Sequence, residues 1–397
     1  MMWFCWTETN RASVIKRRWS RKNEDITRFL PKRKGYGMME KSLSFSDFSK
    51  IYQMLEDDES KDIYLKRLCY LISGDFKFIR EIVNSYLPDL IPEDGVNPEQ
   101  VAIDLPQNRD FVLYGAGADA RLILPIVENN RHFVGFCSRT KQKQKDGYLG
   151  YPVMSPVELL TRKDLGVIVS TRKCKKEIMQ ILTNGGYPQD LICNDPLYYG
   201  NSRCEPEPYF NPSFMTFDNQ EIFVDAGCFD LGTSLKLREF CPQVKVYAFE
   251  PDPESYKRCL ERKEATNFET AQILPFGTWS ERKELHFSAT SDEGSHICET
   301  DAGDGCISAV PIDEAIAEGD KVTFIKMDVE GAELESLKGA EKTIRRDKPK
   351  LAICIYHKPE DMWTIPLYIK ELVPEYKLYI RHYSSAVYDT VLYAVIP

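Results

Sequence analysis

Short apolar runs alternate with amphipathic segments from about residue 109 to the end of the 397-residue chain. In the second half of the chain these runs lie at 222–224, 244–249, 322–325 and 351–355. Nearly continuous apolar runs of this length are typical of strands that are buried on both faces, and helical segments between them are typical of parallel sheets. The pattern therefore predicts an α/β fold with a mostly parallel sheet.

The chain before residue 109 follows two other patterns. Residues 1–37 contain ten Lys and Arg against three acidic residues, so they carry +7 of a total of −9 and leave −16 for the rest. We interpret them as a disordered extension, and a basic arm for an anionic partner is the alternative. Residues 38–100 are expected to form a helical segment, because apolar residues such as Phe45 and Phe48 recur at helical spacing before a linker with proline and glycine.

Residues 109–199 predict a smaller Rossmann-like α/β domain. An apolar strand at 111–114 leads into the turn GAGADA at 115–120, which is close to the G-x-G-x-x-A turn of dinucleotide-binding folds. The next strand ends in Cys137 rather than in the acidic residue that binds the ribose of NAD. We therefore interpret the domain as either structural or a contact domain between copies of the chain. The alternatives are a dinucleotide or sugar-nucleotide pocket and nicotinamide-dependent oxidation.

Composition narrows the class of protein. Hydrophobic residues make up 43% of the chain and charged residues 28%, which is ordinary for a soluble globular protein. The net charge of −9 argues against a general nucleic-acid binder. The twelve cysteines form no C-x-x-C pair, so we expect reduced cysteines in a cytoplasmic protein. No apolar run reaches the roughly 18 residues that a membrane span needs.

A second glycine turn, after the first strand of the carboxyl-terminal half, is the strongest local sign of a ligand site. The strand ends in Asp225, Gly227 and Gly232 bracket the turn, and the Thr-Ser pair that follows Gly232 is expected to cap the next helix. An aspartate stands where the phosphates of a dinucleotide would lie, which favours a nucleoside with a cationic end, such as S-adenosylmethionine. Glu250 ends the next strand, where a carboxylate can accept hydrogen bonds from ribose hydroxyls.

Further ionisable residues follow the later strands. Asp328 and Glu330 come after the third of the apolar runs, and His357 comes after the fourth. Open parallel sheets bind their ligands outside the carboxyl ends of their strands. We therefore expect these three side chains to gather with Asp225 and Glu250 around one site.

The strand ends and the segments beside them resemble the FkbM-type methyltransferase family. The resemblance covers about residues 210–397 and is carried, in this order, by FVDAG, AFEPD, IKMDVEGAELESLKGA, AICIYHKPEDMW and DTVLYA. It implies a methyltransferase domain over 210–397, with a Rossmann-like class I sheet whose final strand is antiparallel. It also implies an S-adenosylmethionine-dependent O-methyltransferase that acts on a hydroxyl of a glycan or of another small hydroxylated metabolite.

The resemblance also implies a role for each site residue. The methionine part of the cofactor is expected at the strand end and turn, at Asp225, Gly227, Cys228, Phe229, Asp230, Gly232 and Thr233. The ribose is expected at Glu250, and the adenine at Phe276 and Gly277. The acceptor hydroxyl is expected at three catalytic residues, Asp328, Glu330 and His357. Among these, His357 is the expected base, because the unperturbed pKa of histidine lies near neutrality.

Alternatives stand beside these roles. For His357 the alternative is a structural hydrogen bond, and for Glu330 it is a helix cap. No metal is assigned, although Asp328 and His357 at neighbouring strand ends are also a pair that can hold a divalent ion. The turn is one residue longer than the common D-x-G-x-N-x-G form of the family. If Leu231 narrows the cofactor pocket, cofactor binding is weak or absent. Leu231 and the additional α/β unit motivate the alternative function, a non-catalytic scaffold that binds a sugar nucleotide or a partner protein in glycan assembly.

Overall fold

The computed structural model covers the predicted helical segment and both predicted α/β units. The predicted extension at 1–37 and the linker near residues 92–98 lie outside the residues that the structure describes. The described residues are 44–73, 77–88, 105, 108–128, 130–171, 174–193, 208–210, 213–288, 296–298, 305–384 and 387–396.

Seven strands form the sheet of the carboxyl-terminal half, in the order β15-β16-β14-β13-β6-β7-β8. Neighbouring strands are parallel from β14 to β8, whereas β16 is antiparallel to both of its neighbours. The predicted fold class is therefore confirmed, a mostly parallel Rossmann-like sheet with an antiparallel final strand. The strands are β6 (Ile222–Ala226), β7 (Lys245–Phe249), β8 (Ala271–Leu274), β13 (Phe324–Met327), β14 (Lys350–Cys354), β15 (Lys377–His382) and β16 (Thr390–Val395).

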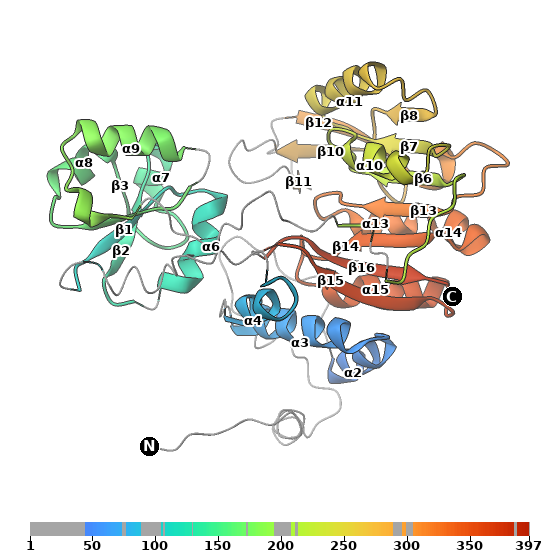
Figure 1. Ribbon diagram of the computed structural model, residues 1–397, viewed down its shortest axis with the longest axis horizontal. Coiled ribbons are helices and arrows are strands. Elements are labelled where there is room, and N and C mark those ends of the chain that lie inside the picture. Colours follow the sequence, from blue (N-terminus) through green and yellow to red (C-terminus); the bar gives the residue numbers. More distant parts are fainter. Residues whose placement is uncertain are drawn as a thin grey trace.

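Helices cover both faces of this sheet (Figure 1). Side chains of α13, α14 and α15 pack on one face with Ile325 and Ile353, and side chains of α10 and α11 pack on the other face with Phe223 and Phe324. The helices are α10 (Gly232–Phe240), α11 (Pro253–Ala265), α12 (Ile312–Ala315), α13 (Glu333–Lys338), α14 (Glu341–Asp347) and α15 (Asp361–Leu372). In the described part of the chain, no helix combines the length and the hydropathy that crossing a bilayer requires.

A smaller sheet of order β11-β10-β12-β9 comes from the chain after β8. The strand β9 pairs in parallel with β12, and β10 pairs in antiparallel fashion with both β11 and β12. The chain therefore leaves the large sheet at Leu274 and enters the smaller one at Gly277. The strands are β9 (Gly277–Thr278), β10 (Lys283–Ser288), β11 (His296–Cys298) and β12 (Gly305–Val310).

The unit expected at 109–199 contains a five-stranded parallel sheet of order β3-β2-β1-β4-β5. Figure 1 shows it apart from the seven-stranded sheet. Its glycine turn joins β1 to α6, and the carbonyl oxygens of the turn accept hydrogen bonds from the side chains of Lys143, Tyr148 and Ser170. The elements are β1 (Phe111–Tyr114), α6 (Ala118–Val127), β2 (Phe133–Cys137), α7 (Lys141–Asp146), β3 (Val153–Met154), α8 (Pro156–Thr161), β4 (Gly166–Val169), α9 (Lys175–Asn184), a 3₁₀ turn (Gln189–Leu191) and β5 (Ile192–Cys193).

The helical segment packs on the edge strand of the carboxyl-terminal sheet. Its helices are α2 (Phe45–Met54), α3 (Asp58–Ser73) and α4 (Lys77–Tyr86), and Figure 1 shows α3 beside β15. The Glu56 N–H donates to the Leu378 carbonyl (3.0 Å), and the Ile380 N–H donates to Ser60 Oγ (2.9 Å). These bonds occupy polar groups of β15 that an uncovered edge strand would leave to solvent.

Candidate active site

Asp225, at the end of β6, is wholly buried. Its Oδ2 accepts a hydrogen bond from Ser234 Oγ (2.6 Å), and its Oδ1 lies 3.2 Å from Lys326 Nζ on β13. Lys326 Nζ in turn donates to the Gly227 carbonyl oxygen (2.6 Å). The carboxylate therefore fixes the glycine turn from inside the fold, and it can support a ligand only through that turn.

Gly227 lies where the turn passes close to the end of β13. Its φ is +77°, and a Cβ at this position would lie 1.9 Å from the Asp328 carbonyl oxygen. The N–H groups of Gly227 and Cys228 both donate to the Phe249 carbonyl at the end of β7, at 3.1 and 3.0 Å. The side chain of Cys228 is buried, with its Sγ 3.6 Å from that of Cys259 on α11. Only glycine fits at position 227, as the sequence predicted.

The extra residue of the turn is absorbed in the core. Phe229 and Leu231 both have left-handed backbone conformations, with φ of +53° and +66°. The side chain of Leu231 is wholly buried in the apolar cluster that contains Leu237 of α10, whereas Phe229 is 64% exposed. The concern that Leu231 narrows a cofactor pocket is therefore wrong, because its side chain points into the core.

The helix after the turn begins without the expected caps. It starts at Gly232, its N-cap residue is Leu231, and no side chain caps it. Thr233 and Ser234 instead lie in its first turn, so their expected capping role is wrong. The physical reason is Asp230. Its Oδ1 accepts a hydrogen bond from the Gly232 N–H (2.9 Å), which forms a tight turn directly before the helix begins.

Glu250, which follows β7, ties that strand to the glycine turn. Its Oε2 accepts a hydrogen bond from the Phe229 N–H (2.8 Å), and its Oε1 accepts one from the Asp252 N–H (2.9 Å). Burial raises the pKa of this carboxyl group to about 7. A carboxylate oxygen has two acceptor sites, so each oxygen keeps one site for a ribose hydroxyl.

The residues expected at the adenine follow the next strand. The Glu250 N–H donates to the Leu274 carbonyl (3.0 Å), so the end of β8 lies beside Glu250. Phe276, two residues later, is partly buried, and Gly277 begins β9. Both residues thus lie just beyond the carboxyl end of the strand that neighbours Glu250.

Asp328, which follows β13, is held by two tyrosine hydroxyls. Tyr209 donates to its Oδ2 (3.0 Å) and Tyr356 donates to its Oδ1 (3.1 Å). Burial raises the pKa of Asp328, but Lys326, His357 and the two hydroxyls outweigh burial and lower it. We did not expect either tyrosine from the sequence. Tyr356 directly precedes His357, which is a usable signal, but Tyr209 lies one residue before the expected start of the domain.

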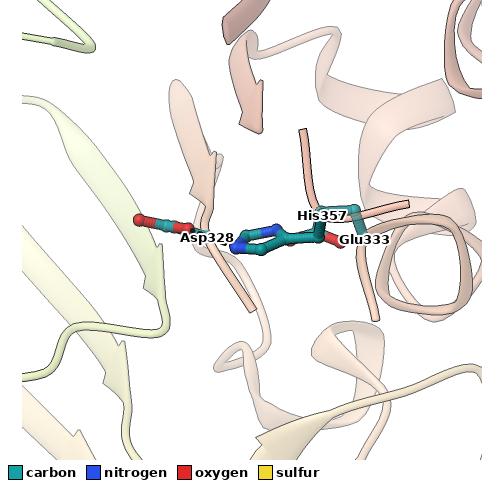
Figure 2. A group of neighbouring side chains, drawn as sticks. All are labelled: Asp328, Glu333 and His357. Carbon is teal, nitrogen blue, oxygen red and sulfur yellow. Dashed lines mark hydrogen bonds and ion pairs between the residues drawn. The ribbon is translucent and has the colours of Figure 1, made fainter. Parts of the chain in front are cut away.

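His357 lies between carboxylates, and Figure 2 shows its imidazole between Asp328 and Glu333. Its Nδ1 lies 2.8 Å from Glu333 Oε1, and its Nε2 lies 3.5 Å from both Asp328 Oδ1 and Glu330 Oε2. Burial lowers the pKa of His357, but the three carboxylates outweigh burial and raise it to about 10. The near-neutral pKa on which its expected role as the base rests is therefore wrong, since a protonated imidazole cannot accept a proton.

Glu330 is the most accessible acidic group of this cluster. Its backbone is left-handed, with φ of +54°, and 49% of its side chain is exposed. Partial burial raises the pKa of this carboxyl group to about 7, against the lowering effect of His357. The alternative of a helix cap is wrong, because α13 begins at Glu333 with Ala332 as its N-cap residue.

The ends of β6, β7, β13 and β14 thus place their ionisable side chains along one edge of the sheet. His357 lies within contact distance of both Asp328 and Glu330, and Gly227 brings the glycine turn against the backbone of Asp328. Such an edge can accept hydrogen bonds from hydroxyl groups and can stabilise positive charge on a ligand.

Comparison with known proteins matches this part of the chain to a described family. Residues 233–384 match the Methyltransferase FkbM domain. The hexuronic acid methyltransferase AglP of Haloferax volcanii is 30% identical over 132 residues, which are 32% of this chain and 54% of that protein. The chain thus spans about half the length of this curated relative.

Two solved structures are also similar to this chain. The methyltransferase FkbM from Methylobacillus flagellatus KT matches with a TM-score of 0.45 and 23% identity, over 81% of this chain and 98% of that chain. An rRNA methylase from Streptococcus thermophilus matches with a TM-score of 0.31 and 16% identity, over 45% of this chain and 89% of that chain. The carboxyl-terminal domain of the chain is thus similar to the FkbM methyltransferase domain over residues 233–384.

Proposed function

We propose that this chain is an S-adenosylmethionine-dependent O-methyltransferase that acts on a hydroxyl of a glycan or of another small hydroxylated metabolite. One observation carries the proposal. The carboxyl ends of β13 and β14 bring Asp328, Glu330 and His357 together directly beside the glycine turn of β6. A methyl donor held by the turn would therefore face a group of side chains that suits a hydroxyl.

The turn and Glu250 fit a nucleoside cofactor that lacks phosphates. Glu250 is fixed by two backbone N–H groups and keeps acceptor sites for ribose hydroxyls. The nearby carboxylates of Asp328 and Glu330 would favour a cationic sulfonium over an anionic diphosphate. The methionine part would lie along the backbone at 227–232, because the side chain of Asp225 is buried.

The reaction would depend mainly on alignment. When bound, S-adenosylmethionine would supply a methyl group that its sulfonium already activates for displacement. Holding the acceptor oxygen in line with the methyl–sulfur bond can lower a barrier by ~7–11 kcal/mol, whereas a general base typically contributes ~10²–10⁴-fold. We therefore assign Asp328, Glu330 and His357 the placement of the acceptor hydroxyl. As the oxygen–methyl bond forms and the methyl–sulfur bond breaks, the hydroxyl proton would pass to the carboxylates of this group.

Two observations support a sugar-like acceptor and an active enzyme. The curated relative is, by its name, a methyltransferase of hexuronic acid, which carries several hydroxyl groups. The alternative of a non-catalytic scaffold rested on the additional α/β unit and on a pocket narrowed by Leu231, and the side chain of Leu231 is buried in the core. We therefore favour a catalytic role over the scaffold.

Calorimetric titration of the full chain with S-adenosylmethionine and with S-adenosylhomocysteine tests the cofactor. We expect one site for each, and we expect Glu250→Ala to weaken both at least ~10-fold, since charge-assisted hydrogen bonds contribute ~1.5–3 kcal/mol each. Glu375→Gln, which changes a 57% exposed carboxylate, is the control. No binding heat and no thermal shift with either ligand would contradict the proposal. Release of S-adenosylhomocysteine in the presence of uronic acids or neutral sugars then identifies the acceptor class.

A further inference from the structure

The two ring nitrogens of His357 have different surroundings. Nδ1 lies 2.8 Å from Glu333 Oε1, which also accepts a hydrogen bond from the Val329 N–H (3.0 Å). Nε2 faces Asp328 Oδ1 and Glu330 Oε2, both at 3.5 Å. These two separations are longer than an ordinary hydrogen bond, so Nε2 is not closely paired with either carboxylate.

The separations around Nε2 are those of ligands that share one ion. Two ligand atoms that each lie about 2.1 Å from a metal ion are about 3–3.5 Å apart at octahedral or tetrahedral angles. Asp328, Glu333 and His357 each offer a ligand atom within 4.8 Å of the others. However, Glu333 Oε1 already pairs with Nδ1 and with the Val329 N–H, whereas Nε2 faces Asp328 and Glu330. The ligand set that fits is Nε2 with Asp328 and Glu330.

The remaining contacts orient these three ligands. A metal-bound imidazole usually donates its other N–H to a carboxylate, and Glu333 is placed to receive it from Nδ1. Asp328 is held by the hydroxyls of Tyr209 and Tyr356, and each of its oxygens keeps an acceptor site. Glu330 leaves the site open to solvent on its exposed side.

Charge supplies an independent reason to expect a cation. Three carboxylates, those of Asp328, Glu330 and Glu333, surround one imidazole, and the nearby Lys326 is paired with Asp225. Glu333 is wholly buried, and its Oε2 has no hydrogen-bond partner in the part of the chain that the structure describes. Buried charge without a partner is costly, and a nearby divalent ion offsets that cost.

We propose that Asp328, Glu330 and His357 Nε2 bind one divalent cation of the Mg²⁺ and Mn²⁺ class. Two carboxylates and one imidazole, open to solvent on one side, suit these ions and leave positions for water or for an acceptor oxygen. The ion would take the place of a proton on Nε2. That the ion polarises the acceptor hydroxyl rests on the proposed function, whereas binding of the ion does not.

Mn²⁺ is the probe for this site, because free Mn²⁺ gives a strong paramagnetic resonance signal that is lost on binding. The full chain is stripped with a chelator, titrated with MnCl₂ without any cofactor, and then titrated with MgCl₂. We expect one Mn²⁺ per chain and its displacement by Mg²⁺. Glu330→Gln is the main variant, since its half-exposed side chain can lose its charge without disturbing the fold, and Asp328→Asn is the second.

We expect each variant to weaken Mn²⁺ binding at least 10-fold, and Glu375→Gln to leave it unchanged. No bound Mn²⁺ at millimolar concentration, or equal binding by Glu330→Gln and Glu375→Gln, would overturn the inference and leave the cluster as a set of ion pairs. The titration contains no methyl donor. Specific Mn²⁺ binding by a chain that binds no S-adenosylmethionine would therefore support this site and contradict only the proposed function.

Discussion

Lys326 Nζ lies 3.2 Å from Asp225 Oδ1, and both side chains are buried in the sheet between β13 and β6. Lys326 also donates to the carbonyl oxygen of Gly227, whereas Oδ1 of Asp225 accepts no hydrogen bond from any described residue. The lysine thus joins the glycine turn, where we propose the cofactor, to the strand that ends in Asp328. The buried ammonium group of Lys326 therefore fixes the position of the glycine turn relative to the end of β13, where Asp328 lies.

Replacing this ammonium should destabilise the fold. Lys326→Met keeps most of the side-chain shape but leaves the carboxylate of Asp225 buried without a counter-charge, which typically costs about 3–5 kcal/mol. Urea unfolding followed by circular dichroism measures the change. The double variant Lys326→Met with Asp225→Asn removes both charges and should recover part of the loss. A single variant as stable as the parent chain would contradict a structural role for the pair.

The pKa of Glu250 predicts a pH dependence of cofactor binding. Burial raises this pKa to about 7, so the carboxylate is mostly ionised at pH 8 and mostly protonated at pH 6. Ribose hydroxyls donate to the ionised form, so the affinity for S-adenosylhomocysteine should fall about ten-fold from pH 8 to pH 6, as the ionised fraction does. Fluorescence titration at several pH values measures the slope. Glu250→Gln, which cannot ionise, should bind weakly at every pH, and an equal slope in this variant would refute the assignment.

The sequence was enough to place the ionisable side chains along the sheet. Asp225, Glu250, Asp328 and His357 each follow an apolar run, and the rule that parallel strands bind ligands at their carboxyl ends brings them to one edge. The structure has these four residues at the ends of adjacent strands. Strand ends are predictable because each run of buried residues stops where a charged group must reach solvent or a partner.

The pairings between these residues could not be predicted, because they depend on distances across the fold. Glu333 was assigned no role in the site, yet its contact with His357 raises the pKa of the histidine. This removes the reason for naming His357 as the base. Lys326 directly follows the apolar run at 322–325, and Tyr209 lies one residue before the expected start of the methyltransferase domain. Leu231 shows the same limit, since sequence alone does not tell whether an extra turn residue faces a ligand or the core.

Gly227 offers a test of how tightly the turn is packed. In Gly227→Ala the new Cβ would lie 1.9 Å from the Asp328 carbonyl oxygen in a left-handed backbone, so we expect a loss of roughly 3 kcal/mol or more. Gly319→Ala is a matched control, because Gly319 has φ of +90° but no atom within 4 Å of an added Cβ. It should cost only about 1–2 kcal/mol for the backbone conformation. Thermal unfolding compares them, and equal losses would mean that the close approach does not matter.

The helical segment at the edge strand gives a prediction about domain boundaries. Arg381 of β15 pairs with Asp57 (2.6 Å) and Glu59 (3.3 Å), and Leu378 and Ile380 of the same strand are wholly buried. A fragment that starts at residue 208 loses these partners and uncovers apolar side chains on this edge. We therefore expect it to unfold at a lower temperature than a fragment of residues 44–397 and to bind more of a hydrophobic dye.

A single substitution separates the contribution of the ion pairs to stability from that of the apolar packing between the helical segment and β15. In the 44–397 fragment, Asp57→Asn removes one charged partner of Arg381 but leaves Glu59 and all of the apolar contacts in place, so the loss should be only about 1–2 kcal/mol. The fragment from 208 should lose clearly more, because burial of the edge strand contributes in proportion to the apolar area that is covered. Equal melting temperatures for the two fragments would show that the carboxyl-terminal sheet is stable without this cover, and the boundary near residue 210 would then mark a complete folding unit.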